Sequence, residues 1–283
     1  MDLRVPDGVT RIEQYDINRE LQSVTSHDYR DDDESIRFAD FVRACKIQNL
    51  IIPASVEGIG NKAFSRVTIH GRIHFAHGSK LNYIGRRAFT EPAPVFSSFY
   101  NEKSSILSLD SITFPSQLRV IGEFAFRRTP TKSVKFTSPN IEISRFSFEG
   151  ARNLESVKFT KHDDSAREIG ASAFYNCPKI REITAHGVTR VERQAFDNPT
   201  HMDPPVIKSA VFLDCIHFGR NIFGKCKIQD LEVGGHPNLE ETLARALYNT
   251  EVEKLIFNQS HGGSKDIPEI PHGVSYDEYL RRR

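Results

Sequence analysis

Residues 169–183 read IGASAFYNCPKIREI, and this stretch decides the fold because its skeleton recurs along most of the chain. The skeleton is I-G-x-x-A-F, a short polar gap, and then two apolar residues three apart. Counted at the second residue of each A-F pair or its equivalent, from Val42 to Leu247, the copies lie 22, 25, 37, 22, 26, 22, 27 and 24 residues apart. The chain is therefore a repeat array with a basic unit of 22 residues, lengthened by insertions.

Each unit carries two alternating signals. The segment after each A-F pair alternates polar and apolar residues and ends in an aromatic, as at residues 133–136 and 156–159, which predicts a half-buried strand. The I-G-x-x-A-F segment spaces its apolar residues four and five apart, which favours a short helical turn, with Gly60 and Gly170 permitting close packing or positive φ. The sequence predicts an α/β solenoid of the leucine-rich-repeat type. Each unit would hold one short strand and one compact helical or 3-10 turn, with a parallel sheet on one face.

We expect one solenoid over residues 1–257, with about nine to ten turns and with insertions near residues 22–36, 90–110 and 197–206. The acidic run at residues 31–34 is most simply a solvated loop within the first insertion. Residues 258–283 are rich in glycine and charge, and either a polar C-terminal tail or a truncated capping turn fits them.

The phenylalanines support a stacked core. Seven of the 20 occupy the A-F position and six others end the expected strands. The first set is Phe64, Phe89, Phe126, Phe148, Phe174, Phe196 and Phe223, and the second is Phe75, Phe114, Phe136, Phe159, Phe212 and Phe257. Stacked turns would align them into two internal aromatic ladders, each ring contributing roughly 1.5–3 kcal/mol by its burial.

Composition narrows the classes of function. The chain has 38 Lys and Arg against 37 Asp and Glu, so its total charge gives no support to a nucleic-acid or anionic-membrane partner. The N-terminus lacks a secretory signal, and no stretch approaches the ~20 apolar residues of a membrane span, so we expect a soluble chain, intracellular or trimmed. Cys45, Cys177 and Cys226 share one repeat position, which favours a buried small hydrophobe over redox chemistry.

The combined pattern I-P-x-x-V-x-x-I-G-x-x-A-F-x-x-C-x-x-L-x-x-I resembles the repeat of BspA-like leucine-rich-repeat proteins, over roughly residues 3–257. That family is found among bacterial surface proteins and in parasitic protists. The resemblance implies a leucine-rich-repeat fold and a role as an adhesin or binding protein, with a host or cell-surface protein among the partners it allows. Surface members carry export signals, which are not seen in this chain.

We expect a non-enzymatic protein-binding scaffold that recognises its partner through the outward residues of its strands and through inserted loops. Alternation along the strands places these candidate contacts outward: Arg72, His74, Thr113, Lys135, Lys158, Glu182 and Thr184. In the insertion near residues 90–110, Phe96, Phe99 and Tyr100 have no place in the ladders and either pack over the solenoid or anchor a partner.

Other readings are weaker. Arginines in the turns, including Arg86, Arg87 and Arg127, would form a basic stripe on the convex side, but no aromatic is regularly interleaved with them for base stacking. A solenoid enzyme acting on polysaccharide needs converging carboxylates, and only Glu182, Asp230 and Glu232 approach that arrangement. His70, His74 and His77 would stand too far apart on a strand to share a metal ion. No cofactor is expected.

Overall fold

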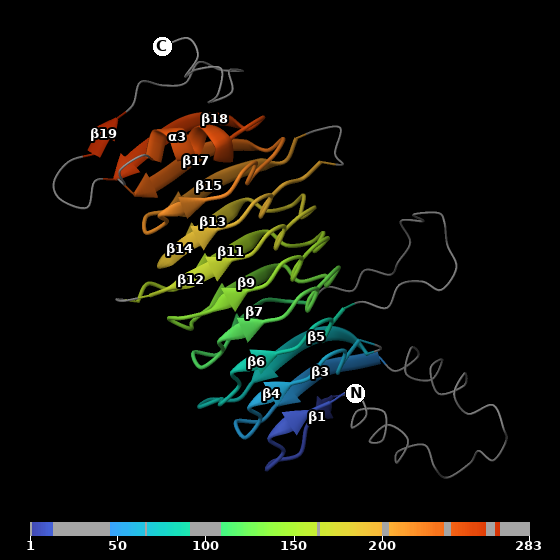
Figure 1. The fold of residues 1–283 in the computed structure, drawn as a ribbon. Helices are drawn as coiled ribbons and strands as arrows, with labels where there is room; N and C mark the ends of the chain where they lie inside the picture. Colours follow the sequence, from blue (N-terminus) through green and yellow to red (C-terminus); the bar gives the residue numbers. More distant parts are fainter. Residues whose placement is uncertain are drawn as a thin grey trace, which may run out of the picture.

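The strands stack along one axis into an elongated parallel β-solenoid (Figure 1). The computed structural model describes residues 2–13, 46–65, 67–90, 109–162, 165–199, 204–234, 239–258 and 264–266. Several predictions fall outside these residues: the role of Cys45, the acidic run, the loop with Phe96, Phe99 and Tyr100, and most of the segment after residue 258.

One side of the solenoid is formed by a first short strand, by the strands that follow each A-F pair or its equivalent, and by a last strand beside them. These are β1 (Leu3–Arg4), β3 (Lys46–Ile52), β5 (Thr68–Phe75), β7 (Ile112–Phe114), β9 (Ser133–Phe136), β11 (Ser156–Phe159), β13 (Glu182–Ala185), β15 (Val206–Phe212), β17 (Lys227–Gly234), β18 (Glu251–Asn258) and β19 (Ser264–Asp266). We call this side the strand face. The predicted parallel sheet is confirmed, but it is divided into a sheet β1-β3-β5 and a sheet from β7 to β19, in which only β19 pairs antiparallel.

A second sheet, which we did not predict, runs without interruption along another side. Its strands are β2 (Arg11–Ile12), β4 (Gly58–Ile59), β6 (Tyr83–Ile84), β8 (Val120–Ile121), β10 (Glu142–Ile143), β12 (Arg167–Ile169), β14 (Val188–Val191) and β16 (His217–Phe218). Each pairs in parallel with the equivalent strand of the next turn, so Ile143 aligns with Ile121 and Ile169. The Ile of the I-G motif is buried in these strands, because it points into the core while its neighbour faces outward.

The α/β assignment was wrong, because the I-G-x-x-A-F segment is a strand followed by a turn. Instead of bonding within a helix, the Phe64 N–H donates to the Ala88 carbonyl of the next turn at 2.7 Å, and the Phe174 N–H donates to the Ala195 carbonyl at 2.7 Å. The residue before the Ala of each pair or its equivalent has a left-handed backbone, with φ between 54° and 58°. These residues are Lys62, Arg87, Phe124, Phe146, Ser172, Gln194 and Asn221.

In the described part of the chain, the one helix is α3 (Leu239–Ala246), which follows β17 where earlier turns have a strand of the second sheet. It continues the bonding between turns, because the N–H groups of Asn221 and Ile222 donate to the carbonyls of Arg245 and Ala246 at 2.9 and 2.8 Å. Helix α3 therefore takes the place of a second-sheet strand and the turn after it in the stack.

Glycine in the I-G motif serves close packing, one of the two roles that the sequence left open. The motif glycines are absent from the residues with positive φ. A Cβ at Gly170 would lie 2.7 Å from the Ile143 carbonyl oxygen, and one at Gly85 would lie 2.6 Å from the Asn61 nitrogen. Backbones of successive turns meet at these points, and the left-handed conformation belongs to the residue two positions later.

The A-F ladder is confirmed over its whole length, with ring centroids of neighbouring turns 4.8–5.8 Å apart from Phe64 to Phe223. The strand-end ladder is confirmed only in part. Phe114, Phe136 and Phe159 stack in order, but Ala185 aligns with Phe159 in the next turn and Val233 stands between Phe212 and Phe257. Phe212 instead packs edge-on against Phe196 and Phe223.

Candidate functional site

The strand face displays its outward residues in registered rows. Ser133 aligns with Ser156 and Lys135 with Lys158, because β9 and β11 pair without a shift. The row continues from Thr113 through Lys135 and Lys158 to Thr184, one residue per turn. All four side chains are exposed or half-buried, as the alternation predicted. The structure thus brings these four candidate residues side by side on one face.

The remaining candidates divide between the two parts of the strand face. Glu182 is exposed on β13 and its carboxylate lies 3.3 Å from the Lys158 ammonium, so it neutralises part of the lysine row. Arg72 and His74 are exposed on β5, on the other side of the division. Phe96, Phe99 and Tyr100 lie outside the described residues. The carboxylates considered for catalysis are separated by β15, since Ser209 stands between Glu182 and Asp230 in the register.

The division of the strand face lies between β5 and β7, where the long insertion leaves and re-enters the solenoid. Ring centroids of Phe75 and Phe114 are 6.1 Å apart there, against 5.1 Å for the next pair, Phe114 and Phe136. The position after Phe114 is Pro115, which has no N–H to donate. At equivalent positions, Ala76 and Thr160 donate to the carbonyls of the preceding turn, at 2.9 and 3.0 Å. The β5/β7 step therefore lacks this hydrogen bond, and β5 and β7 are not paired with each other in any sheet.

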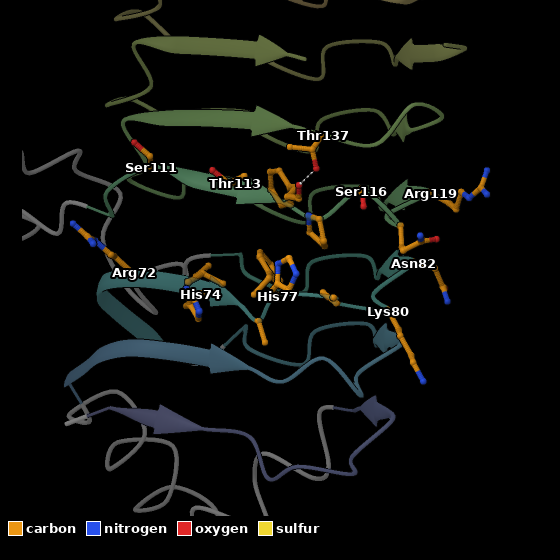
Figure 2. Close-up of a pocket in the computed structure, with 18 of the residues that line it drawn as sticks. Arg72, His74, His77, Lys80, Asn82, Ser111, Thr113, Ser116, Arg119 and Thr137 are labelled. Carbon is orange, nitrogen blue, oxygen red and sulfur yellow. Dashed lines mark hydrogen bonds between the residues drawn. The ribbon is translucent and has the colours of Figure 1, made fainter. Parts of the chain in front are cut away.

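A groove of about 1060 Å³ opens over this step, and we call it the β5/β7 groove. It runs from the strand face around the corner to the second sheet, and Figure 2 shows Arg72 near one end and Lys80 and Arg119 at the other. Its polar and charged lining residues are Arg72, His74, His77, Ser79, Lys80, Asn82, Asp110, Ser111, Thr113, Ser116, Gln117, Arg119, Lys132 and Thr137. Sequence reasoning named three of these as candidates but gave no sign that they bordered a groove.

Charge in the β5/β7 groove is predominantly positive. Asp110 is the one carboxylate in the lining, and it forms an ion pair with Arg72 at 3.2 Å. Lys80, Arg119 and Lys132 are exposed, and within the described residues no carboxylate lies in ion-pair range of them. These cations are available to a partner that carries negative charge.

Histidine does not gather into a metal site within the described ranges. His74 and His77 line the β5/β7 groove, while His70 does not, and no group of three His, Cys, Asp or Glu residues able to hold a metal ion occurs there. In the same part of the chain, no helix is long and apolar enough to cross a membrane.

Four arginines of the stripe in the turns contact neighbouring carboxylates or rings. Glu123 pairs with Arg86 at 3.1 Å and with Arg145 at 2.5 Å, and Arg127 pairs with Glu149 at 2.9 Å. The structure also adds an aromatic pair that the sequence analysis overlooked: Phe124 and Phe146 stack at 5.2 Å, and the guanidinium carbons of Arg87 and Arg127 lie 5.4 and 5.3 Å from the Phe124 ring. Carboxylates and rings therefore hold the side chains of Arg86, Arg87, Arg127 and Arg145.

Arg167 was missed altogether. It lies fully buried at the start of β12, although arginine is rarely buried without partners. Its Nε donates to the Ser138 carbonyl at 2.7 Å, and its Nη1 donates to the carbonyls of Thr160, at 2.8 Å, and His186. Burial lowers the pKa of the guanidinium, and Asp214 opposes that shift. Arg167 ties three successive turns together; its place at the start of an I-G strand was the only signal.

Cys177 and Cys226 are buried, as their shared repeat position indicated, and Cys215 is buried at a different position of the repeat. Cys177, Cys215 and Cys226 are buried free thiols, and burial raises the pKa of each to about 12. The Cys177 and Cys226 thiols lie 3.3 and 3.7 Å from the carbonyls of Phe148 and Phe196 in the preceding turn. They pack and bridge turns, and their raised pKa values make them poor nucleophiles.

Comparison with known proteins places the repeat in a family. Residues 2–100 and 96–203 match the "BspA type Leucine rich repeat region", with six copies. No curated protein matches the sequence significantly.

Among solved structures, the chain is similar to the pneumococcal vaccine antigen PcpA, with 17% identity, a TM-score of 0.34 and 76% of this chain covered. The match spans only 57% of the PcpA chain. A leucine-rich repeat protein from Eubacterium ventriosum matches at 12% identity and a TM-score of 0.37, covering 97% of this chain and 85% of that one. A leucine rich cell surface protein from Faecalibacterium prausnitzii matches at 12% identity and a TM-score of 0.24, covering 92% and 87%. Since the repeat match extends over residues 2–203, the chain belongs to the BspA-type leucine-rich-repeat family.

Proposed function

We propose that the chain is a non-enzymatic protein-binding scaffold and that the strand face is its contact surface. One observation carries this proposal: the outward row Thr113, Lys135, Lys158 and Thr184 is held in register by a continuous parallel ladder. A rigid ladder fixes the backbone beneath these side chains before any partner arrives. Less conformational freedom is then lost on binding, which favours affinity.

Charge on the strand face supports selective recognition. Lys135 and Lys158 lie side by side, and the outward positions of β13 and β17 carry Glu182, Asp230 and Glu232. Such a change of sign along one face fixes the direction in which a partner of complementary charge can dock, and it accelerates the encounter at low salt. The Lys158–Glu182 pair is about half exposed at both ends, so it contributes only ~0–1 kcal/mol to folding and remains available for exchange with a partner.

The test uses two charge-matched double variants as baits in a pull-down from the native cell lysate and from host-cell surfaces. One variant carries Lys135→Glu and Lys158→Glu on the strand face. The control carries Lys62→Glu and Lys225→Glu, which change the same charge on exposed turn residues. We expect one set of partners to be captured by the wild type and by the control but lost with the strand-face variant.

Circular dichroism and thermal unfolding of each bait establish that the charge changes leave the fold intact. Equal capture by all three baits would overturn the strand face as the contact surface.

A further inference from the structure

The floor of the β5/β7 groove is closed by the two strands themselves. The rings that end β5 and β7 have their centroids 6.1 Å apart. Direct backbone hydrogen bonds join the two turns at both ends of the step, from the Asp110 N–H to the Gly71 carbonyl at 3.2 Å and from the Arg119 N–H to the Asn82 carbonyl at 2.8 Å. A strand inserted here would need about twice the ~4.8 Å spacing of paired strands. A ligand must therefore lie on top of the step, where side chains hold it.

The side chains exposed along the groove are hydrogen-bonding groups rather than apolar anchors. Of the large apolar residues in the lining, Ile73 and Phe114 are buried and Phe75 is half-buried. A peptide side chain finds no apolar pocket to fill, whereas a sugar offers hydroxyls to the polar groups and the C–H groups of its face to the Phe75 ring. The exposed uncharged polar residues in the lining include His74, His77, Asn82, Thr113, Ser116 and Gln117.

Asp110 is the one carboxylate in this lining, and its side chain is 48% exposed. It accepts a hydrogen bond from the Arg72 Nε at 3.2 Å. A carboxylate has about four acceptor positions, so this bond leaves others open. An acidic peptide or a nucleic acid would be repelled by Asp110. Sugar hydroxyls can donate to it, and the neighbouring guanidinium can donate to the oxygens of the same sugar.

Free cations distinguish the groove from a site for neutral sugars. Arg72, Lys80, Arg119 and Lys132 set against Asp110 give the lining a net charge of 4 − 1 = +3. Lys80 and Arg119 lie together toward the second sheet, away from the Arg72 end (Figure 2). A neutral sugar would leave these two cations without a partner, so the ligand should carry acid groups as well as hydroxyls.

From these features we infer that the β5/β7 groove binds an anionic oligosaccharide. Its carboxylate or sulphate groups pair with Lys80 and Arg119, and its hydroxyls donate to the Asp110 carboxylate. Acidic peptides and single-stranded DNA could neutralise the cations, but they lack a dense set of hydroxyl donors. The inference goes beyond the proposed function and does not depend on it, because it assigns a ligand of another class to a separate surface.

The experiment measures the affinity of the wild-type chain for fluorescently labelled probes by anisotropy. A hexagalacturonate carries carboxylates, a heparin-derived hexasaccharide also carries sulphates, and maltohexaose is the neutral control. A glutamate hexapeptide and a short single-stranded DNA represent the other polyanions. We expect at least one of the two anionic hexasaccharides to bind more tightly than all three other probes, and the better of the two identifies the acid group.

A charge-reversing variant locates the site. Lys80→Glu with Arg119→Glu should weaken binding of the preferred hexasaccharide at least about tenfold, because it replaces attraction by repulsion. Lys62→Glu with Lys225→Glu makes the same change on exposed turn residues outside the groove and should stay within about threefold of the wild type. Circular dichroism and thermal unfolding establish that each variant is folded.

Asp110→Asn separates recognition of hydroxyls from attraction by charge, because the two predict opposite signs. Removing this carboxylate also releases Arg72, so a ligand held by charge alone should bind more tightly. An oligosaccharide that donates to Asp110 should instead bind at least about fivefold more weakly. Asp7→Asn is the matched control, since Asp7 forms an exposed ion pair with Arg4 at 3.3 Å outside the groove, and it should change nothing.

Several results would overturn the inference. These are no binding of either anionic hexasaccharide, equal affinity in the Lys80→Glu, Arg119→Glu variant, or tighter saccharide binding by Asp110→Asn. Preference for the peptide or the DNA would assign the groove to that class of ligand, and equal binding of maltohexaose would remove the role of the acid groups. None of these results bears on the strand face, which is tested separately through Lys135 and Lys158, so either proposal can fail while the other stands.

Discussion

The ring of Phe174 stacks on the ring of Phe196 with centroids 5.1 Å apart and planes 2° from parallel. Phe148 lies at the same distance on the other side of Phe174. Phe174 is fully buried, so both faces of the ring contact other rings rather than water. The stability of the central turns therefore depends on a continuous column of rings that passes through the I-G-x-x-A-F motif.

Phe174→Ala should lower the free energy of unfolding by about 3–5 kcal/mol, because it removes a buried ring and leaves a cavity between two others. The urea midpoint of the variant, compared with the wild type, measures the loss. Tyr248→Ala is the control, since that aromatic side chain is 51% exposed and its removal should change stability by about 0.5 kcal/mol or less. Matching urea midpoints for wild type and Phe174→Ala would show that the ring of Phe174 does not stabilise the solenoid in this way.

Arg167→Met should destabilise the solenoid by about 2–4 kcal/mol. The thioether side chain fills part of the buried volume but cannot donate to the carbonyls of Ser138, Thr160 and His186, which would lose a charged donor inside the protein. Urea unfolding measures the change. Arg190→Met provides the matched control, because Arg190 is 45% exposed and its ion pairs with Glu168 and Glu192 lie at the surface. We expect ~1 kcal/mol or less there, and an equal loss in both variants would contradict a special role for Arg167.

The strands and the inward or outward direction of their side chains could be predicted from the sequence, because alternation of apolar and polar residues is a local signal. Lys135 and Lys158 were placed correctly for that reason. The second sheet could not be predicted in the same way. Its strands are only two to four residues long, as at Glu142–Ile143, and they are held by bonds to other turns that leave little periodicity within the segment.

The β5/β7 groove depends on contacts that no single repeat contains. Its lining comes from three turns, because Lys132 and Thr137 flank β9, and it includes Lys80 and Arg119, which precede β6 and β8 of the second sheet. Neither residue belongs to a strand-face pair, so alternation along the strands gave no reason to choose it. Arg167 was overlooked for a related reason: its three carbonyl acceptors belong to three different turns.

The thiols of Cys177, Cys215 and Cys226 should be protected from thiol reagents, and they should make the free energy of unfolding fall as pH becomes alkaline. Burial raises the pKa of Cys177, Cys215 and Cys226 to about 12, from an ordinary value of 9.0. The unfolded chain therefore releases these protons first as pH rises above about 9, so folding stability from this source is complete below that pH and falls above it. In a Cys45→Ser background, thiol reagents at pH 8 should label none of the three until denaturant is added.

The pH dependence is isolated by comparing that background with a variant in which all three cysteines are also replaced by alanine. Between pH 8 and pH 10, the urea midpoint of the protein with thiols should fall more steeply, because lysine and tyrosine titration is common to both. Parallel slopes, or rapid labelling of the native protein, would contradict the assignment of these thiols to the core.

Leu243→Ala should loosen one end of the solenoid while leaving its middle unchanged. Leu243 is buried in α3, and the last carbonyls of that helix accept hydrogen bonds from Asn221 and Ile222 of the preceding turn. The substitution should cost α3 about 2–5 kcal/mol of stability. In a repeat stack each turn contacts only its neighbours, so the turns next to α3 should become the easiest to open. Native-state hydrogen exchange should accelerate at the amides of β17, β18 and Asn221, while those of β9 and β11 keep their wild-type rates.

Glu253→Ala, at an exposed position on β18, should leave every rate unchanged. Equal acceleration from β9 to β18 would instead mean that the solenoid opens as one cooperative unit.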